Sequence, residues 1–190
     1  MDENNVKLRG LASYSSAFIA PSTYQLFSPY GDVDLNPETS QTFEFGFDSS
    51  YDKLVNFRAM YFNRTEDEAI IFKNLNAAPW GVYANSDETI KVSGVEADIT
   101  VKPNDKVKLN VGYTYTDKNT DLDYIPTNKL VANIDFYATE NSFVSLTYRN
   151  IGDRLAKYYD STTFSTVETT LPKYNLLDLN ANYKLLEGTV

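Results

Sequence analysis

The sequence predicts an all-β fold: an antiparallel, up-and-down transmembrane β-barrel segment that supplies about eight strands of a larger barrel. Three observations lead to this prediction. Apolar and polar residues alternate in runs along the whole chain, the connections between these runs alternate between short and long, and no apolar run approaches the length of a transmembrane helix. The 190 residues include 15 Tyr and 11 Phe, and aromatic residues favour strands over helices.

The alternation is clearest in the run from 106 to 117, where Val107, Leu109 and Val111 alternate with lysine and asparagine. Successive residues of a strand point to opposite faces of a sheet, so this run has one apolar and one polar face. The same pattern predicts strands, in chain order, at 6–16, 42–48, 54–72, 89–102, 106–117, 129–138, 143–152 and 177–186.

Each strand is predicted from its own set of alternating apolar residues. In chain order, these are Val6, Leu8, Ala12 and Tyr14; Phe43, Phe45 and Phe47; Val55, Phe57, Ala59 and Tyr61; Val95, Ala97, Ile99 and Val101; Val107, Leu109, Val111, Tyr113 and Tyr115; Leu130, Ala132, Ile134 and Phe136; Val144, Leu146 and Tyr148; and Leu177, Leu179, Ala181 and Tyr183. Several of the strands reach the roughly ten residues that cross a bilayer when tilted. Tyr or Phe near their ends fits the aromatic girdles at the two membrane interfaces.

The connections between the strands alternate in length. Short turns are predicted at 49–53, 103–105 and 139–141, and long connections at 18–40, 73–88, 118–127 and 156–173. In an up-and-down sheet, this order puts every tight turn on one rim and every long loop on the other. Outer-membrane barrels have this layout, with short periplasmic turns and long extracellular loops. A soluble β-sandwich mixes its loop lengths more freely.

Composition excludes several classes of function. The net charge of −9 argues against nucleic acid as a partner, because phosphate binding needs clustered Lys and Arg. The chain has no Cys and no His, which removes the usual catalytic triads and most zinc and haem ligands. Glu38, Glu44 and Glu96 have no nucleophile and no glycine-rich phosphate loop beside them. We therefore expect no enzyme activity, no cofactor and no metal site.

Several segments resemble TonB-dependent outer-membrane receptors, above all those for cobalamin and siderophores. The matching segments are Ala20-Pro21 with Gln25-Leu26-Phe27, Asn36-Pro37-Glu38, Glu44-Phe45-Gly46, Tyr61-Phe62-Asn63-Arg64, Ser93-Gly94-Val95-Glu96-Ala97, Ile125-Pro126-Thr127-Asn128-Lys129, Tyr148-Arg149 with Gly152-Asp153-Arg154, and 174–183. They occur in the family's order over nearly the whole chain. One departure is that Asn36-Pro37-Glu38 merges what many members carry as two motifs.

The resemblance implies a barrel of about 22 strands filled by an N-terminal plug. It also implies a substrate bound between extracellular loops and plug, and a TonB complex that pulls on the plug. On this mapping, residues 1–190 are a C-terminal portion of the barrel, located in the outer membrane of a Gram-negative bacterium, that lacks the plug, the TonB-contacting segment and the final hairpin. The expected function is a part in energised uptake of a metal chelate or cobalamin-like solute. Outer-membrane lipid is a further expected partner, and the fragment alone is not expected to transport.

Two other classes of function remain open: an autonomous eight-stranded envelope barrel with a structural or adhesive role, and a soluble ligand-binding β-domain. The predicted polar faces carry charges of both signs, which suits a solvated lumen that meets a polar plug. They would also suit the solvent-exposed face of a soluble sheet.

The candidate ligand contacts are aromatic residues of the long loops. A large, rigid ring contact suits a bulky ligand, and such side chains on one rim suggest a binding surface. These candidates are Tyr24, Phe27, Tyr30, Trp80, Tyr83, Tyr124, Tyr158 and Tyr159, with Phe164 beside the last two. The alternative is that these rings pack within the loops or form the outer girdle.

The segment 117–123 superficially resembles a calcium-binding loop because it carries Asp117, Asp121 and Asp123. The sixth position of such a loop is glycine and the twelfth is glutamate, but here they are Leu122 and Asn128. A solvated acidic loop is therefore the preferred interpretation, with a loosely held Ca²⁺ as the alternative.

Overall fold

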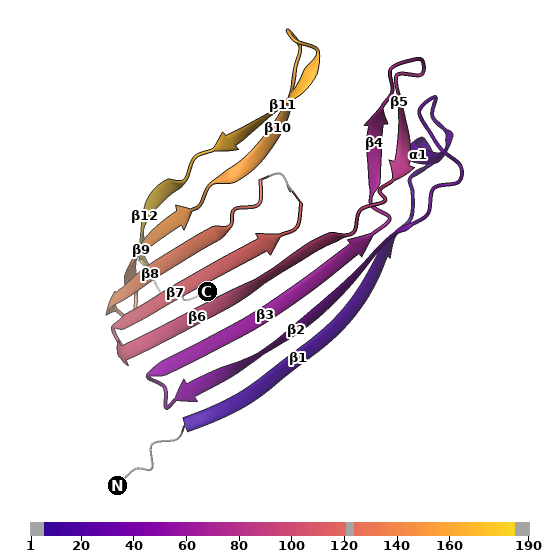
Figure 1. Ribbon diagram of the computed structural model, residues 1–190. Helices are drawn as coiled ribbons and strands as arrows, with labels where there is room; N and C mark the ends of the chain where they lie inside the picture. Colours follow the sequence, from indigo (N-terminus) through magenta and orange to yellow (C-terminus); the bar gives the residue numbers. More distant parts are fainter. Residues whose placement is uncertain (1–5, 121–123, 185–190) are drawn as a thin grey trace, which may run out of the picture.

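The computed structural model describes residues 6–120 and 124–184 and contains one large, curved antiparallel sheet (Figure 1). Its eight strands lie in the order β1-β2-β3-β6-β7-β8-β9-β12. They are β1 (Val6–Ile19), β2 (Glu38–Tyr51), β3 (Val55–Asp67), β6 (Ile90–Asn104), β7 (Val107–Lys118), β8 (Asn128–Thr139), β9 (Ser142–Ile151) and β12 (Tyr174–Tyr183). Each of these strands pairs with the neighbours expected for an up-and-down sheet. The predicted all-β antiparallel fold is therefore confirmed.

Two small hairpins and one helical turn lie within the long connections, and the sequence analysis predicted none of them. The first hairpin pairs β4 (Ile70–Asn74) with β5 (Gly81–Asn85), and the second pairs β10 (Arg154–Asp160) with β11 (Ser165–Leu171). The helical turn α1 (Thr23–Phe27) begins at Ser22, whose side chain accepts a hydrogen bond from the Gln25 backbone while the Gln25 side chain accepts one from the Ser22 backbone. This reciprocal capping satisfies free N–H groups at the start of the helix.

The predicted strand 54–72 is wrong in one respect, because the structure divides it between β3 and β4. The break falls at Glu68, which has a positive φ of 59°, and at the buried Ala69. A left-handed backbone conformation at a non-glycine residue ends a strand. Of the predicted strand 177–186, positions 185 and 186 lie outside the described residues.

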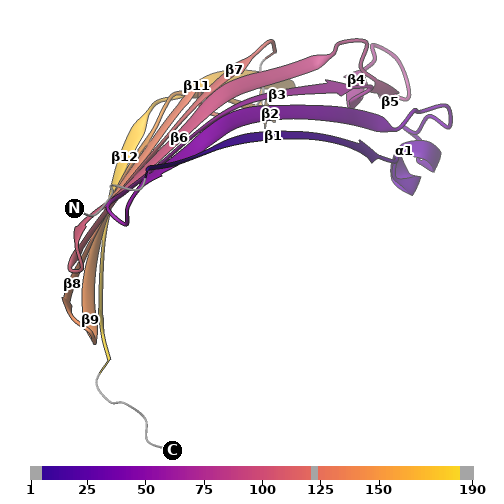
Figure 2. The same ribbon diagram turned by 90° about the horizontal axis from the view of Figure 1, so that it is seen from below.

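The large sheet is bent but open. Figure 2 shows its curvature, with β9 and β12 turned well away from the plane of β1 and β2. In the described residues, β1 pairs only with β2 and β12 pairs only with β9, so both edge strands carry unpaired backbone groups. The sheet is thus not closed into a small eight-stranded barrel.

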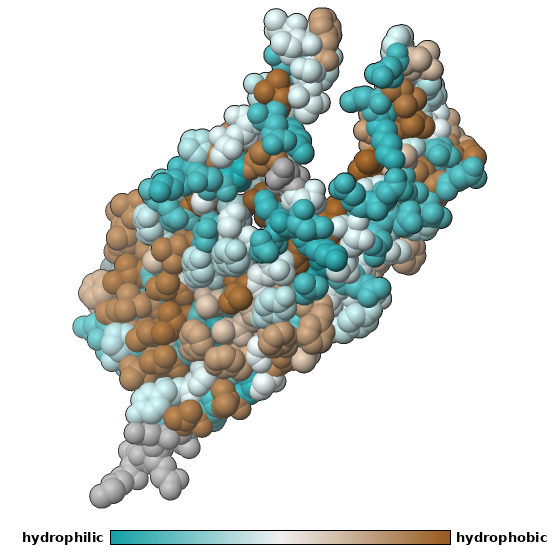
Figure 3. All heavy atoms as spheres, in the orientation of Figure 1, coloured by the Kyte–Doolittle hydropathy of each residue, from teal (hydrophilic) through white to brown (hydrophobic). Residues whose placement is uncertain are grey.

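The apolar face of the sheet is exposed. Aromatic pairs such as Phe45–Tyr61 and Phe47–Phe57, with ring centroids 5.1 and 5.7 Å apart, cover part of it. Figure 3 shows the resulting apolar area over the strands, whereas hydrophilic and hydrophobic residues are mixed on the hairpins. The buried hydrophobic residues in the described part of the chain are Leu35, Ala69 and Ala156, and none belongs to the large sheet. This sheet has no hydrophobic core of its own, so its apolar face needs a partner such as lipid.

The opposite face carries polar ladders that run across the strands. Arg9, Asp48, Arg58 and Asp98 are successive cross-strand neighbours on β1, β2, β3 and β6, and their charges alternate in sign. Arg9 forms an ion pair with Asp48. Opposite charges in directly paired positions stabilise a sheet modestly and favour one register.

Further along the same face, amide and hydroxyl groups replace the charges. The Thr100 hydroxyl donates to Asn110 at 3.0 Å, and the amides of Asn110 and Asn133 lie 3.2 Å apart. Asn133 in turn contacts the hydroxyls of Ser145 and Thr147. The alternation of apolar and polar residues in the sequence therefore gives the large sheet one apolar face and one face of hydrogen-bonded polar side chains.

Gly94 on β6 is needed because Phe62 lies against it. A Cβ at this position would come within 2.1 Å of the Tyr115 carbonyl oxygen and 2.6 Å of the Phe62 ring. Real Cβ atoms do not approach other atoms that closely. The absence of a side chain at Gly94 thus leaves room for the Phe62 ring on the polar face, at the long-loop end of β3.

Candidate ligand-binding site

The first long connection is fixed to the β4–β5 hairpin by backbone and side-chain hydrogen bonds. The Tyr83 N–H donates to the Tyr30 carbonyl at 2.8 Å. The Asn85 side chain accepts from the Asn36 N–H at 2.8 Å and donates to the carbonyls of Asn36 at 3.0 Å and Glu68 at 2.7 Å. These bonds make one folded unit of two connections that are distant in the sequence.

Four rings pack within this unit, and we call Tyr24, Tyr30, Phe72 and Tyr83 the loop aromatic cluster. The edge-to-face pairs Tyr24–Tyr83, Tyr30–Phe72 and Phe72–Tyr83 have centroid distances of 6.1, 5.8 and 5.2 Å. The structure thus brings together three of the predicted contact residues. It adds Phe72, which the sequence analysis had assigned to a continuous strand.

The other predicted contact residues lie outside this cluster. Phe27 and Trp80 are largely exposed, at 72% and 67% of their surface. Tyr124 belongs to a different part of the rim, where its N–H donates to the Leu155 carbonyl of β10 at 2.7 Å. Tyr158 and Tyr159 are exposed on the β10–β11 hairpin. Figure 1 shows the two hairpins rising from separate places on the rim.

A hollow of about 450 Å³ lies on the polar face just below this rim, and we call it the glutamate hollow. Its lining residues come from β2, β3 and β6, with Ile125 contributed by the β7–β8 connection. They are Thr42, Glu44, Phe62, Arg64, Glu66, Ile90, Val92, Glu96 and Ile125. Apolar groups line most of it, which is usual for small-molecule sites. The sequence analysis judged Glu44 and Glu96 only as possible catalytic acids and did not place them beside apolar residues.

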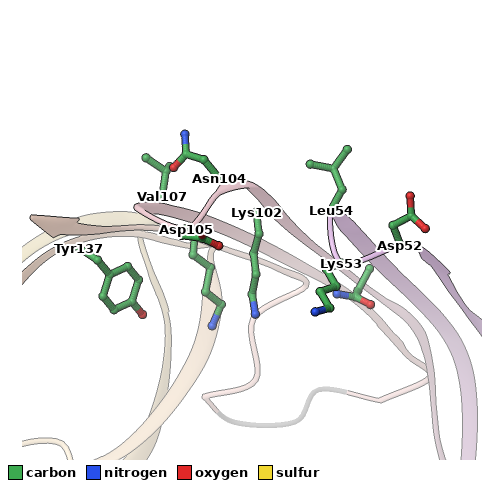
Figure 4. A pocket seen from close by; sticks show the side chains of 10 residues that line it. Asp52, Lys53, Leu54, Lys102, Asn104, Asp105, Val107 and Tyr137 are labelled. Carbon is green, nitrogen blue, oxygen red and sulfur yellow. The ribbon is translucent and has the colours of Figure 1, made fainter. Parts of the chain in front are cut away.

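A larger hollow of about 800 Å³ lies at the opposite rim, beside the short turns, and its lysines are Lys53, Lys102 and Lys108. Figure 4 shows Lys102 and Tyr137 pointing to the concave side of the sheet, whereas Leu54 and Val107 point to the other side. The polar face is therefore the concave one. The charged residues that line the two hollows differ: three glutamates and one arginine near the long loops, and three lysines with Asp52 and Asp105 near the short turns.

Replacing Asn85 with alanine is expected to free the first connection from the β4–β5 hairpin. Three hydrogen bonds are lost, and each contributes about 0.5–1.5 kcal/mol, so the local loss is roughly 1–3 kcal/mol after allowance for exposure. Hydrogen exchange at the Tyr83 and Ile70 amides should accelerate, while exchange in the large sheet stays unchanged. Asn74→Ala on the same hairpin is the control, and equal exchange in both variants would contradict this role.

The tip of the β10–β11 hairpin, outside the strands of the large sheet, is expected to loosen in acid. The Thr162 N–H donates to the Asp160 carboxylate at 2.8 Å and the Thr163 hydroxyl donates at 3.0 Å. These bonds hold the pKa of Asp160 below its ordinary value of 3.8. Their contribution is therefore complete above that value and is lost as pH falls through the lowered pKa. Amide exchange at Thr162 should rise in this range, and Asp160→Asn should show weaker pH dependence; identical profiles would refute the assignment.

No metal site is found in the described part of the chain, where no group of three or more His, Cys, Asp or Glu residues could hold an ion. The calcium-like loop is not fully covered by this statement, because residues 121–123 lie outside the described residues. Among the described residues, no helix is long and apolar enough to cross a membrane.

A comparison of the sequence with known protein families identifies the family of this chain. The family described as "TonB dependent receptor-like, beta-barrel" matches residues 4–190. The chain belongs to this family. Members are β-barrels of the Gram-negative outer membrane, and that is where this TonB-dependent receptor segment resides.

Individual relatives agree with this assignment. The TonB-dependent receptor segment is 26% identical over 191 aligned positions to the vitamin B12 transporter BtuB of Vibrio cholerae serotype O1. The alignment covers 81% of this chain and 29% of the transporter, so the chain spans less than a third of that relative's length.

Solved structures share the fold. The pyoverdine outer-membrane receptor FpvA of Pseudomonas aeruginosa PAO1 superposes with a TM-score of 0.72 at 21% identity, over 95% of this chain and 28% of FpvA. The siderophore receptor PirA of Acinetobacter baumannii gives 0.69 at 16% identity, over 98% of this chain and 34% of PirA. The copper transporter OprC gives 0.70 at 13%, over 98% of this chain and 30% of OprC. The open sheet of this TonB-dependent receptor segment thus matches part of a larger barrel in each case.

Proposed function

We propose that this chain forms part of a receptor for energised, TonB-dependent uptake of a metal chelate or cobalamin-like solute across the outer membrane. The observation that carries the proposal is the family match over nearly the whole chain. The relatives transport or bind vitamin B12, pyoverdine, another siderophore or copper, according to their names. The proposal assigns this chain the same general task.

The open sheet supports a role as one sector of a larger wall. Its apolar face would meet lipid, and its concave polar face would meet a plug segment that fills the lumen. In that arrangement residues 1–190 would be a C-terminal sector of the barrel. The TonB complex would act through the plug rather than through this sector.

The rim with the long connections is the proposed entrance for the solute. The loop aromatic cluster would make the β4–β5 unit rigid, while the exposed rings of Phe27, Trp80, Tyr124, Tyr158 and Tyr159 would be free to contact a bulky ligand. A rigid rim with exposed aromatic side chains suits binding of a large ring system at low entropic cost.

The test is uptake by cells that carry or lack the complete receptor containing this chain. Labelled cyanocobalamin and a panel of iron-55 siderophores would be supplied, with and without an uncoupler of the proton gradient. The expected result is receptor-dependent accumulation of one solute class, abolished by the uncoupler while surface binding persists. Accumulation that is equal in both strains for every solute, or that resists the uncoupler, would rule the proposal out.

A further inference from the structure

We infer that three lysines at the short-turn rim dock an acidic segment of the receptor polypeptide that lies in the lumen and outside residues 1–190. Lys53, Lys102 and Lys108 line the hollow of about 800 Å³ described above, which we call the lysine hollow. The inference rests on the proposed function, in which the concave face meets a plug segment. It adds the place at which that segment is held and the chemistry that holds it.

The three lysines extend toward the lumen. Figure 4 shows Lys53 and Lys102 on the concave side of the sheet, together with Tyr137. Lys108 also faces this side, because it follows Val107, which points to the convex side, and neighbouring strand residues face opposite ways. The apolar face that needs lipid is the opposite one. The partner of these ammonium groups therefore comes from within the lumen rather than from the lipid side.

Nearby carboxylates do not neutralise the three lysines. None of the ion pairs in the described residues includes one of them. Asp52 also lines the hollow, but Figure 4 shows its carboxylate on the convex side. Asp135 stands opposite Lys108 in the register without forming an ion pair with it in the described residues. Asp105 is the remaining acid of the lining, so positive charge exceeds negative charge on the concave side.

A β-bulge brings two of the lysines together. The pairing of β6 with β7 shifts its register between Val101 and Asn104. Lys102 and Pro103 of β6 therefore both stand opposite Lys108 of β7. Bulges re-aim side chains at the rims of barrels, and like charges in opposed positions destabilise a sheet. This local repulsion is relieved when an anionic group lies between the two ammonium groups.

Backbone hydrogen bonds fix the points from which the lysines extend. The Lys102 N–H donates to the Leu54 carbonyl at 2.7 Å, and the Tyr137 N–H donates to the Lys106 carbonyl at 2.8 Å. The Asn104 side chain accepts from the Lys106 N–H at 2.9 Å. The β2–β3 turn, the β6–β7 turn and the end of β8 are thus joined. The long side chains can adjust, while their attachment points stay in place around one hollow.

This arrangement fits carboxylates on a peptide segment. Each lysine ammonium offers three N–H donors, and its hydrogen bonds to a carboxylate are strengthened by charge. Water solvates these groups while the sheet is open, but a segment that fills the lumen removes part of that water. Loss of hydration is costly for an ammonium group unless an anion replaces the water. A neutral or basic segment would leave the opposed lysines uncompensated, whereas neighbouring Asp or Glu residues would pair with them.

The first experiment applies a water-soluble carbodiimide to the complete receptor in outer membranes. This reagent joins an amine to a carboxylate that it contacts directly. Mass spectrometry is expected to find Lys53, Lys102 or Lys108 linked to Asp or Glu in the plug segment. Lys106 is the internal control, because it belongs to the same turn as Lys102 but does not line the hollow, and it should remain unlinked.

The second experiment measures amide hydrogen exchange in the linked segment of the complete receptor. Changing all three lysines to glutamine should accelerate this exchange roughly three- to thirtyfold, the combined effect of three partly screened ion pairs. Changing all three to arginine keeps the charges and should leave exchange near the parent value, as should Lys106→Gln. Added salt should accelerate exchange in the parent but not in the glutamine variant, because salt screens exposed charges.

The outcomes separate this inference from the uptake function. Lysines that link to no carboxylate of the plug segment, or only to another protein, would overturn the inference even if uptake is normal. The same conclusion follows if the glutamine and arginine variants show equal exchange. If the receptor accumulates no cobalamin or chelate while the predicted links form, the uptake function fails and the docking stands. Heat-modifiable migration of each variant in gels shows that faster exchange does not reflect an unfolded barrel.

Discussion

In buffer without detergent, the isolated chain is expected to form large, polydisperse species that light scattering detects at micromolar concentration. Its accessible surface of 13,667 Å² is well above the roughly 9,200 Å² expected for a compact monomer of 21.5 kDa. Leu8 on β1 and Leu179 on β12 are exposed by 72% and 73% on strands whose outer edges are unpaired. Exposed apolar strands with free N–H and C=O groups pair with other chains.

A double substitution on the apolar face of β12 tests whether this exposed edge strand causes the self-association. Leu177→Lys with Leu179→Lys should reduce self-association in buffer, because charged edge strands resist pairing. The same changes should impair insertion of the complete receptor into lipid, since lysine on the lipid face costs about 2–4 kcal/mol near the bilayer midplane. A monodisperse unmodified chain with a cooperative thermal melt would show instead that its edges are covered within one molecule.

Gly94→Ala is expected to prevent correct assembly of most receptor molecules. The added Cβ would meet the Tyr115 backbone carbonyl at 2.1 Å and the Phe62 ring at 2.6 Å. Overpacking of this kind typically costs about 1–3 kcal/mol, and a backbone contact cannot be relieved by a change of rotamer. The folded fraction, measured by heat-modifiable migration in gels, should fall severalfold, and the midpoint of urea unfolding should fall with it.

Gly10→Ala is the matched control, because a Cβ there has no atom within 4 Å. It is expected to fold as the parent does. Adding Phe62→Ala to Gly94→Ala should relieve the ring contact but not the carbonyl contact, so only partial recovery is expected. Equal folded fractions for the two glycine variants would mean that β6 and β7 adjust freely around Gly94.

The sequence was sufficient to predict the large sheet because two periodic signals agree there. Alternation gave the eight strands to within a few residues, and the order of short and long connections gave their up-and-down arrangement. The hairpins were missed because strands such as Ile70–Asn74 and Arg154–Asp160 are short and do not alternate cleanly. Aromatic and β-branched residues on both sides of Pro79 and Gly81 were a usable signal for the first hairpin.

The candidate site was predictable only in part, because contacts between connections are set by three-dimensional packing. The loop rings were identified by residue type and position, yet nothing in the sequence shows that Tyr24, Tyr30 and Tyr83 gather around Phe72. The glutamate hollow depends on cross-strand register, which places Phe62 beside Gly94 and brings Glu44 and Glu96 to one face. A strand pattern read alone gives the face of each residue but not its neighbours on other strands.

The β10–β11 hairpin has a practical use that follows from its position. Phe164 at its tip is 78% exposed, and its strands pair with each other rather than with the large sheet. Insertions at exposed turns of this kind are tolerated because few buried groups depend on them. If the long connections face outward, as proposed, a short epitope or fluorophore-binding tag between Ser161 and Thr162 would therefore report on the receptor at the surface of living cells. The tag would leave the barrel wall unaltered, and the same place offers evolution a site for changing surface recognition without rebuilding the wall.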